Sequence, residues 1–468
     1  MKHRLIVVAP LVFIAACGSS SESITPSGTD AASADVKVDD ASDAPIDANG
    51  DATVDPCASA KPNVIALDPK TAKEADVQKA FVSAKPGDVL QLGEGTFSFT
   101  NGLVLAANCV TVRGAGMDKT ILDFSGQLAG SEGIYGDHPK AFVLEALTVR
   151  DTKGNGVKVL GADGLTFRKV KTEWTGADAT KHGAYGLYPV ESKRVLIEDC
   201  VATGANDSGI YVGQSNMVVT RRNRAEQNVA GIEIENTFNA DVYENVAIHN
   251  TAGILVFDLP GLPQLGGNHV RVFKNTIKDN NTKNFAAKGD IVSMVPAGVG
   301  FFVMANHDVE VFGNTFDGNT TAHSSVVSYY VTQLDIKDAK YYPWPASVFL
   351  HDNTYLGGGD APDTDHDLGA LLAVNKDKFP GGVSPQIIYD GILDPAKTTP
   401  ADNPMQLCLK GNVIGGTSPA KDASFANMHL DKLPKGSIDI GPYLTTDTKP
   451  HACTPAALPA VTWPGLAP

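Results

Sequence analysis

The sequence lacks several features that mark common classes of protein, and each absence narrows the choice of function. It has no Cys-x-x-Cys pair and no Cys/His/Asp cluster at transition-metal spacing, so a structural zinc site is not expected. No glycine-rich phosphate loop leads from a strand into a helix, so nucleotide binding has no support. The net charge is -15 and no basic stripe is present, which argues against nucleic acid as a partner.

Runs of residues that favour a helix are also few, and a repeat takes their place. Between residues 150 and 320, short Gly-apolar-x-apolar segments recur at intervals of about 22 residues. Their glycines are Gly156, Gly186, Gly209, Gly231, Gly253 and Gly298. An interval of this length is too short for a pair of stacked helices, and it fits one coil of a β-solenoid.

The alternation inside one repeat predicts which side chains face the interior of the coil. In AGIEIEN, Ile232 and Ile234 share one strand face, whereas Glu233 and Glu235 share the other. The isoleucines must face inward, because carboxylates cannot stack in a dry core without partners. One asparagine per repeat is predicted to join a hydrogen-bonded ladder and to take the left-handed backbone that a corner needs. These asparagines are Asn223, Asn245, Asn275, Asn314 and Asn353.

The segment before the repeats has a different pattern. Residues 71–84 carry apolar side chains at helical spacing, and Thr71 with Glu74 predicts a capping box. The helix, the Pro-Gly-Asp turn and the strand that follow resemble the start of many right-handed parallel β-helix proteins of the pectin-lyase-like superfamily. Together with the repeat, the resemblance implies an all-β fold. We expect a single-stranded right-handed parallel β-helix (a β-solenoid) over residues 57–445, with a short N-terminal capping helix and a Pro-rich capping tail at 446–468.

The first 56 residues are expected to lie outside this fold. Residues 1–16 join a basic start to an apolar stretch that is too short to span a membrane comfortably. The string Ile14-Ala15-Ala16-Cys17 resembles the lipobox of a bacterial lipoprotein signal, and an ordinary signal peptide is the main alternative. The resemblance implies acylation of Cys17 and a lipid anchor in the bacterial cell envelope, at the outer membrane. The composition of residues 17–56 predicts a disordered acidic linker.

Five cysteines remain after Cys17, and an extracytoplasmic setting permits disulfides. Cys408 and Cys453 both lie in the Pro-rich C-terminal region and are the first choice of pair. Cys57 with Cys109 is a further possibility, because both lie near the N-terminal cap. Cys200 aligns with the asparagine corner and is expected to be a buried free thiol, although the pairing of these last three cysteines stays open.

Chemistry is expected on the outward side of the repeats. Alignment of the coils on their glycines gives one outward column of Lys158, Tyr188, Tyr211, Glu233 and Leu255, and a second of Gly213, Glu235 and Phe257, with Gln214, Asn236 and Asp258 beside it. Coils stacked about 4.8 Å apart would place these residues in one groove, flanked by insertions at 259–269 and 280–296. We predict catalytic roles for Glu233, Glu235 and Tyr211, and substrate contacts for Tyr188, Gln214, Asn236, Phe257 and Asp258.

The same residues allow other interpretations. Two carboxylates on one face suit a general acid and base, and with Asp258 they also suit calcium. Outward tyrosines suit the C–H faces of sugar rings. The plain alternative is a solvated wall of a solenoid, where charged side chains are common. Strongly raised carboxyl pKa values would favour an enzyme, and solvated carboxylates with ordinary pKa values would favour a binding protein.

Longer strings point to a narrower relationship. YGLYP, SGIYVGQS, AGIEIEN, AGILVFDLPGLP and VPAGVGFF resemble bacterial lipoproteins described as parallel β-helix repeat-containing proteins. The resemblance covers residues 60–455 and implies the fold and an envelope location. That family has no established reaction, so it assigns no catalytic residue. Motifs of better-known β-helix enzymes depart from this sequence, since Asp-Pro-His-Asp is matched only by the scrambled Gly136-Asp137-His138-Pro139.

Two classes of function therefore remain. One is an envelope protein that binds polysaccharide and cleaves it by lyase or hydrolase chemistry in the outward groove. The other is a non-catalytic envelope protein that binds a glycan or a protein on the same face.

Overall fold

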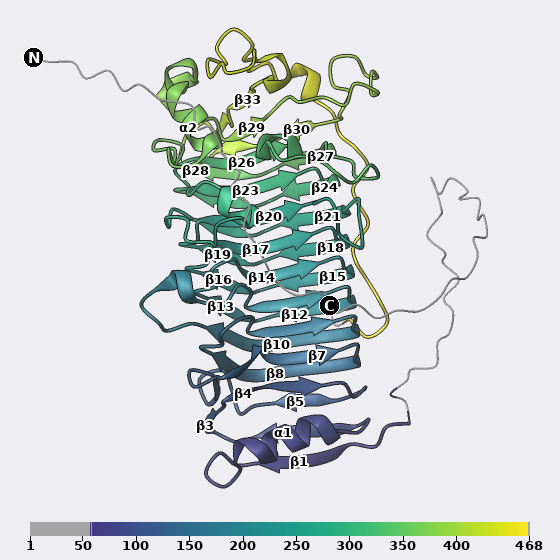
Figure 1. Cartoon of the computed structure of the whole chain (residues 1–468). Coiled ribbons are helices and arrows are strands. Elements are labelled where there is room, and N and C mark those ends of the chain that lie inside the picture. The colour runs from purple at the N-terminus through teal and green to yellow at the C-terminus, as the bar shows by residue number, and fades with distance from the viewer. Residues whose placement is uncertain (1–56, 58, 467–468) are drawn as a thin grey trace, which may run out of the picture. The chain divides into compact units, whose positions relative to one another are not determined.

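The computed structural model describes residues 57 and 59–466. The expected signal peptide, the acylation site at Cys17 and the linker to residue 56 lie outside the described residues. Within residues 59–466, no helix is long and apolar enough to cross a membrane. The described chain winds into a stack of parallel coils, which rises from β1 (Asn63–Leu67) and α1 (Glu74–Ser83) at one end to β33 (Phe425–Asn427) at the other (Figure 1). The predicted fold class, a parallel β-helix with a short N-terminal helix, is confirmed.

One coil consists of three strands separated by tight corners. β14 (Ser208–Gly213), β15 (Asn216–Arg221) and β16 (Arg224–Glu226) form one coil. The next coil consists of β17 (Ala230–Glu235), β18 (Phe238–Tyr243) and β19 (Val246–Ile248). The register is parallel, with Ile210 opposite Ile232 and Val218 opposite Ala240. Equivalent positions of successive repeats therefore stack directly, as the sequence alignment on glycines assumed.

The first side of the solenoid is an eleven-stranded sheet, called sheet B here. Its strands are β4 (Asn101–Leu105), β7 (Ala129–Asp137), β9 (Val157–Leu160), β11 (Leu187–Val190), β14, β17 (Ala230–Glu235), β20 (Ala252–Phe257), β23 (Val299–Met304), β26 (Ala322–Val327), β29 (Ile387–Tyr389) and β33 (Phe425–Asn427).

The other two sides belong to a 22-stranded sheet, called sheet A here. Its strands are β1 (Asn63–Leu67), β2 (Asp88–Leu92), β3 (Gly95–Ser98), β5 (Thr111–Arg113), β6 (Thr120–Asp123), β8 (Lys140–Arg150), β10 (Asp163–Glu173), β12 (Lys193–Glu198), β13 (Val201–Thr203), β15, β16, β18 (Phe238–Tyr243), β19 (Val246–Ile248), β21 (Asn268–Phe273), β22 (Thr276–Lys278), β24 (His307–Phe312), β25 (Thr315–Asp317), β27 (Ala346–His351), β28 (Thr354–Leu356), β30 (Cys408–Lys410), β31 (Val413–Ile414) and β32 (Lys421–Asp422).

The interior is a continuous apolar core. Ile232 and Ile234 are fully buried, as the alternation predicted, and they belong to a core cluster that extends from Val77 to Phe425. Because a single coil cannot enclose its own apolar side chains, the stacking of coils supplies most of this burial.

The predicted asparagine ladder is present. Each side-chain amide donates to the carbonyl oxygen of the next asparagine at 2.9–3.0 Å, along the series Asn223, Asn245, Asn275, Asn314, Asn353 and Asn412. A second ladder, which was not predicted, joins Asn228, Asn250, Asn280 and Asn319. The left-handed residue at each corner is the one before the asparagine, such as Arg222, Glu244 and Lys274, each with φ of 54°. The prediction that the asparagine itself is left-handed was wrong, because its backbone N–H must point along the stack to the next amide.

The ladder supports a stability prediction. Asn250 accepts from the backbone N–H and the side chain of Asn228, and donates to Asn280 and to the Ala225 carbonyl. Asn250→Ala should lower the free energy of unfolding by about 2 kcal/mol, because it leaves buried polar groups unsatisfied. Denaturant melts followed by circular dichroism measure the change. Asn216→Ala is the control, since Asn216 is half-buried and accepts one side-chain bond, from Asn239. Equal effects of the two substitutions would contradict the structural role of the ladder.

One glycine of the repeat was misplaced. Ala252 on β20 pairs with Val299 on β23, so the partner of Gly253 is Gly300 and not Gly298. A Cβ on Gly253 would lie 2.4 Å from the Gly300 carbonyl oxygen, which explains why the position needs glycine. The insertion at 280–296 hid the true register, because it separates these two repeats by an irregular length.

The N-terminal helix is confirmed, although its cap differs from the prediction. α1 (Glu74–Ser83) begins after Lys73, whose backbone N–H donates to Asp76 at 2.9 Å. The predicted box of Thr71 and Glu74 is wrong, because Glu74 instead accepts from the backbone and side chains of Thr100 and Asn101 at the start of β4. Glu74 therefore ties the helix to the first coils.

The cysteines are arranged as the sequence suggested. Cys408 forms a disulfide with Cys453, and Cys57 forms one with Cys109. Cys200 is a buried free thiol, and burial raises its pKa to about 12, so it is not a reactive thiolate.

The tail that was expected to cap the C-terminal end instead runs back along the side of the solenoid. Figure 1 shows this segment, residues 452–466, in yellow beside β27, β24, β21 and β18. The Leu458 N–H donates to Glu310 and the Val461 N–H donates to Asp241, both at 3.1 Å. Val461 also packs with Leu196 and Val219 of earlier coils. We call this segment the strap.

Candidate functional site

The predicted outward columns are confirmed in register. On sheet B, Lys158 pairs with Tyr188, and Tyr211 pairs with Glu233, which pairs in turn with Leu255. The second column places Glu235 between Gly213 and Phe257. The carboxylates of Glu233 and Glu235 therefore do lie on the outward face of β17.

The expected open groove is not what the structure contains. Glu233, Glu235 and Tyr211 are only 4%, 7% and 5% exposed, and the neighbouring Asp258 and Phe257 are fully buried. The reason is a second apolar layer over the next coils, in which Leu255, Phe257, Phe302 and Met304 pack against Val292, Val295, Tyr329 and Tyr341. The segments 280–296 and 329–341, here called the cover, supply that layer.

The side chains of the first column become steadily less buried from Leu255 to Lys158. Leu255 is fully buried, Glu233 and Tyr211 are nearly so, and Tyr188 and Lys158 are half-buried. The carboxylates thus lie at the edge of the cover, and the remaining access to them is from the side of the N-terminal coils.

The sequence analysis did not predict that Asp207 belongs to this site. Asp207, 5% exposed, precedes β14, and its neighbour Ser208 lies between it and Glu233. In the stacked coils, Val229 and Thr251 hold the positions equivalent to Asp207. A lone acid in a column of uncharged residues was the available signal. We call Asp207, Glu233 and Glu235 the carboxylate cluster.

Ser208 links two members of this cluster. Ser208 Oγ lies 3.0 Å from Asp207 Oδ1 and also contacts Glu233 Oε2. A hydroxyl has a single hydrogen, so it donates to only one of these oxygens. A proton on the other carboxyl group would satisfy the second contact, in agreement with the raised pKa of both acids.

Glu235 has a different environment. Its Oε1 accepts from the Tyr211 hydroxyl at 2.5 Å and from Gln214 Nε2 at 3.1 Å. Two donors favour the ionised form of a carboxyl, whereas burial disfavours it. The two glutamates of β17 are thereby made unequal, and Glu233 keeps its proton to a higher pH than Glu235 does.

The pKa values follow from these surroundings. Burial, together with nearby carboxylates, raises the pKa of Glu233 well above its usual range. Burial also raises the pKa of Asp207 and of Glu235 to about 7, although hydrogen bonds to Ser208 and Tyr211 oppose the shift. The pKa of Tyr211 rises for the same reasons, burial first and then the charge of Glu235. Among the residues that the structure describes, no ion pair links the cluster to a basic side chain.

This electrostatic arrangement predicts a pH-dependent stability. A carboxyl whose folded pKa lies above its unfolded value makes the folded state bind protons more tightly, so its contribution to stability falls as pH rises from about 4 to about 7. The double variant Glu233→Gln/Glu235→Gln should therefore melt above the wild type at about pH 8, and the difference should shrink toward about pH 4. Thermal melts at several pH values measure it. A difference that stays constant with pH would contradict the shifted pKa values.

Asn236 and Asp258, which were predicted to contact the substrate, form hydrogen bonds to a neighbouring loop instead. Asn236 donates to the carbonyls of Leu259 and Gln264, at 2.9 and 2.8 Å. Asp258 accepts from the backbone N–H groups of Gly266 and Gly267. Burial raises the pKa of Asp258 to about 6. Both side chains thus hold the 259–267 loop in place beside the cluster, a role that fits their full burial better than contact with a substrate.

The tyrosines form a compact group beside the carboxylates. The ring centroids of Tyr185, Tyr188 and Tyr211 are 4.6–4.9 Å apart, and Lys158 Nζ lies 5.2 Å from the Tyr188 ring. Burial raises the pKa of Tyr188 to about 12, so its hydroxyl stays protonated at neutral pH. Tyr185 and Tyr188 keep part of their surface exposed, and they form the accessible border of the cluster.

The calcium interpretation finds no geometric support in the described part of the chain. Residues 57 and 59–466 contain no group of three or more His, Cys, Asp or Glu side chains arranged to hold a metal ion.

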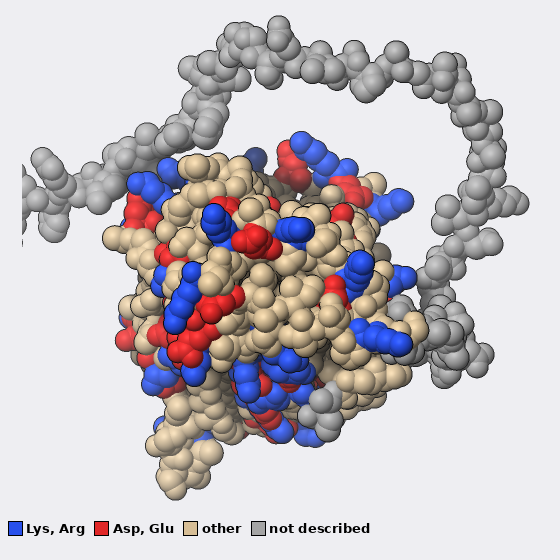
Figure 2. Space-filling view, turned by 90° about the horizontal axis from the view of Figure 1, so that it is seen from below, with Lys and Arg blue, Asp and Glu red and all other residues tan. Residues whose placement is uncertain are grey.

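Charges of both signs are intermixed on the end of the solenoid that carries α1 (Figure 2).

A family model described as a right-handed beta helix region matches residues 132–338. The match covers the central coils, including the carboxylate cluster. No curated protein sequence matches the chain.

Solved structures of the same architecture are also similar to this chain. The A-module of a mannuronan C-5 epimerase from Azotobacter vinelandii is 15% identical, with 75% of this chain and 94% of that chain covered and a TM-score of 0.47. An alginate lyase from a Paenibacillus species is 18% identical, over 63% and 94%, with a TM-score of 0.38. The N-terminal fragment of gene product 12 of bacteriophage Phi29 is 13% identical, over 74% and 62%, with a TM-score of 0.47. Similarities at this level concern the fold, and the function has to be argued from the residues.

Proposed function

We propose that the protein binds a polysaccharide beside Tyr188 and cleaves it with Glu233 and Glu235 as an acid–base pair. The observation that carries the proposal is the joint burial of Asp207, Glu233 and Glu235 without a basic partner in the described chain. Burial of this kind costs stability, because the carboxyl groups lose their hydration and gain no counter-charge. Carboxyl groups with such raised pKa values gather at catalytic sites.

The two glutamates take complementary roles. Glu233, in contact with Ser208, holds a proton and donates it to the leaving oxygen of a glycosidic bond. Glu235 is partly ionised near neutral pH and acts as the base. Their Cβ atoms are roughly 7 Å apart, because residues i and i+2 of a strand lie on one face. A hydrolase would use Glu235 to activate water, and a lyase would use it to remove the proton beside a uronate carboxyl group.

The tyrosine group supports a sugar as the ligand. Tyr188 is half-buried, and its ring packs against Tyr185 and Tyr211, which hold it in place. A half-exposed aromatic ring that its neighbours hold in place can bury the C–H face of a sugar at low entropic cost, and its hydroxyl can form a hydrogen bond. Lys158 beside this ring adds a positive charge that suits an acidic sugar.

We further propose that the protein acts at the bacterial cell envelope, held by a lipid on Cys17. The lipobox-like string at 14–17 supports this. Mass spectrometry of the mature N-terminus tests it. Detection of an acylated Cys17 is expected, and release of a Cys17→Ala protein from membranes should accompany it. An unmodified N-terminus at another residue would overturn the proposal.

A polysaccharide panel tests the reaction. Each polymer is incubated with the protein and assayed both for unsaturated uronate absorbance and for new reducing ends. Absorbance together with reducing ends identifies a lyase, and reducing ends alone identify a hydrolase. If no polymer is cleaved but at least one retards the protein in affinity electrophoresis, the protein is a binder.

That second candidate, a non-catalytic glycan-binding protein, has one observation in its favour. The carboxylates are at most 7% exposed, which leaves little room for a glycosidic bond beside them. In this case Tyr188 and Lys158 alone would contact the glycan, and Glu233→Gln would leave affinity unchanged.

A further inference from the structure

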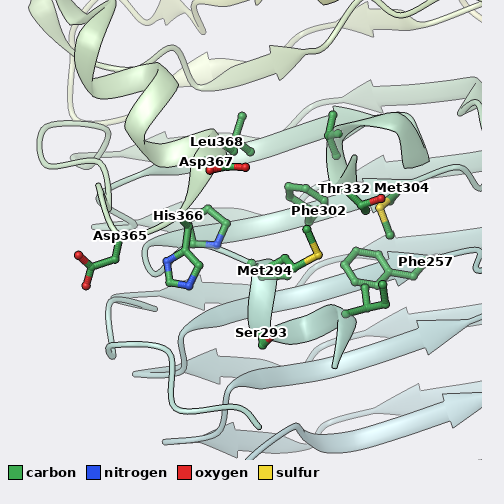
Figure 3. A pocket seen from close by; sticks show the side chains of 14 residues that line it. Phe257, Ser293, Met294, Phe302, Met304, Thr332, Asp365, His366, Asp367 and Leu368 are labelled. Carbon is green, nitrogen blue, oxygen red and sulfur yellow. The ribbon is translucent and has the colours of Figure 1, made fainter. Parts of the chain in front are cut away.

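A cavity lies on sheet B one coil beyond the carboxylate cluster. Its volume is about 230 Å³, and Phe257, which pairs directly with Glu235, forms part of its wall. Figure 3 shows Phe257, Met304 and Thr332 on one side, Asp365 and His366 on the other, and Met294 and Phe302 between them. The cavity is thus bounded by two strands, the cover and the loop that leads into α2 (Asp367–Val374).

The wall of this cavity is mainly apolar and adaptable. Phe257 and Phe302 meet edge to face, with ring centroids 5.7 Å apart. Met294 is 38% exposed at the rim, whereas Met304 is buried inside. Methionine side chains adjust their shape to a bound group, and contacts between sulfur and aromatic rings are favourable. An apolar cavity of about 150 Å³ holds benzene, so this larger one has room for an aromatic ring with a substituent.

The polar groups that line the cavity are few, namely Ser293, Thr332, Asp365, His366 and Asp367. His366 Nδ1 lies 2.7 Å from Asp363 Oδ2, so Nε2 is the ring nitrogen left to meet a ligand. Asp363 also accepts the Ala297 N–H, which holds the loop against the cover. Asp365 and Asp367 belong to the lining, and no Lys or Arg side chain does within the described chain. Lys283 pairs with Asp365 from outside the lining, at 3.1 Å.

We infer that this cavity is a second ligand site, which binds a small aromatic group carrying a neutral or cationic hydrogen-bonding substituent. The ring would lie against Phe257, Phe302 and Met304, with its substituent toward His366 and Asp367. An anionic substituent would meet the carboxylate of Asp367 and is disfavoured by like charge. This inference does not depend on glycan cleavage, because it uses no residue of the carboxylate cluster.

Three probes with one ring and different charges test the inference. 2-Phenylethylamine, 2-phenylethanol and phenylacetate are titrated into the whole protein at low salt, and saturation-transfer NMR reports binding. The amine and the alcohol should bind, and the amine should bind at least about fivefold tighter than phenylacetate, because the rim is acidic. Equal affinities, a preference for phenylacetate, or no binding of any probe would overturn the inference.

Substitutions in the wall of the cavity test whether the probes bind there. Val331→Trp fills the cavity and should abolish binding, and Met294→Ala removes an exposed wall residue and should weaken it about threefold or more. If Val331→Trp fails to fold, Met294→Ala still tests the site, because Met294 is already partly exposed and its replacement should not disturb the fold. Leu128→Ala, at a 78% exposed position outside the lining, is the control and should bind as the wild type does. Binding that survives both cavity variants would place the probe elsewhere and refute the site.

Discussion

Glu233→Gln should reduce cleavage of the substrate polysaccharide by about a thousandfold, because loss of a general acid typically costs 10²–10⁴ in rate. Glu235→Gln should have a comparable effect. The wild-type rate should depend on pH around neutrality, since the pKa of Glu235 is raised to about 7 by burial. In the Glu235→Gln protein, the part of the pH profile that belongs to Glu235 should disappear, whereas the dependence on Asp207 and Glu233 should remain. Initial rates on the cleaved polymer, measured across pH, provide the comparison.

Glu198 offers a matched control on sheet A. It is also a buried outward glutamate, 4% exposed, but it pairs with Arg168, Arg221 and Arg222. Burial raises the pKa of Glu198, and the hydrogen bonds and charges of these arginines outweigh that effect, so its pKa is lowered overall. Glu198→Gln should therefore reduce stability and leave the rate almost unchanged, the opposite of Glu233→Gln. If both glutamate positions on β17 tolerate Gln with full activity, the catalytic role is refuted.

Gly253→Ala should lower the free energy of unfolding by about 3 kcal/mol or more, because an overpacked core must shift backbone to make room. The added Cβ would lie 2.4 Å from the Gly300 carbonyl oxygen and 2.5 Å from Ile277 Cγ2. Neither neighbour can swing aside, since one is backbone and the other is part of the core. Thermal and denaturant melts report the loss.

Gly126→Ala is the matched control for this substitution. A Cβ at Gly126 would meet only the Phe99 carbonyl oxygen, at 3.6 Å, which is an ordinary contact. Its melting temperature should stay close to that of the wild type. Comparable losses at Gly126 and Gly253 would show that the conformational freedom of glycine matters more than the close approach between coils.

Local periodicity was enough to predict the fold and to show which side chains share one outward column. The alternation around Ile232 determined the inward and outward faces, and the spacing of glycines brought Tyr211, Glu233 and Leu255 into one column. Such patterns survive in a solenoid because each coil contacts mainly its neighbours, so a regular repeat in sequence becomes a regular repeat in space.

Features that depend on distant segments were missed. The cover comes from insertions without a repeat, so nothing local to Glu233 indicated that its carboxyl group is buried. The same insertions hid the fact that Gly300, and not Gly298, is the glycine that pairs with Gly253 in the next coil. Asp207 was overlooked because it lies just before the repeating segment, and its partnership with Glu233 exists only across two coils.

The strap changes how the solenoid is expected to unfold. A stack of coils held only by nearest neighbours behaves as a one-dimensional array, in which an end can fray while the middle stays intact. Here Leu458 and Val461 join β24 to β18, and the Cys408–Cys453 disulfide anchors the strap at β30. Unfolding of the last coils therefore also disrupts the contacts that the strap makes with β24 and β18. Terminal coils and central coils should lose protection from hydrogen exchange together, as one cooperative unit, even though the rest of the architecture is modular.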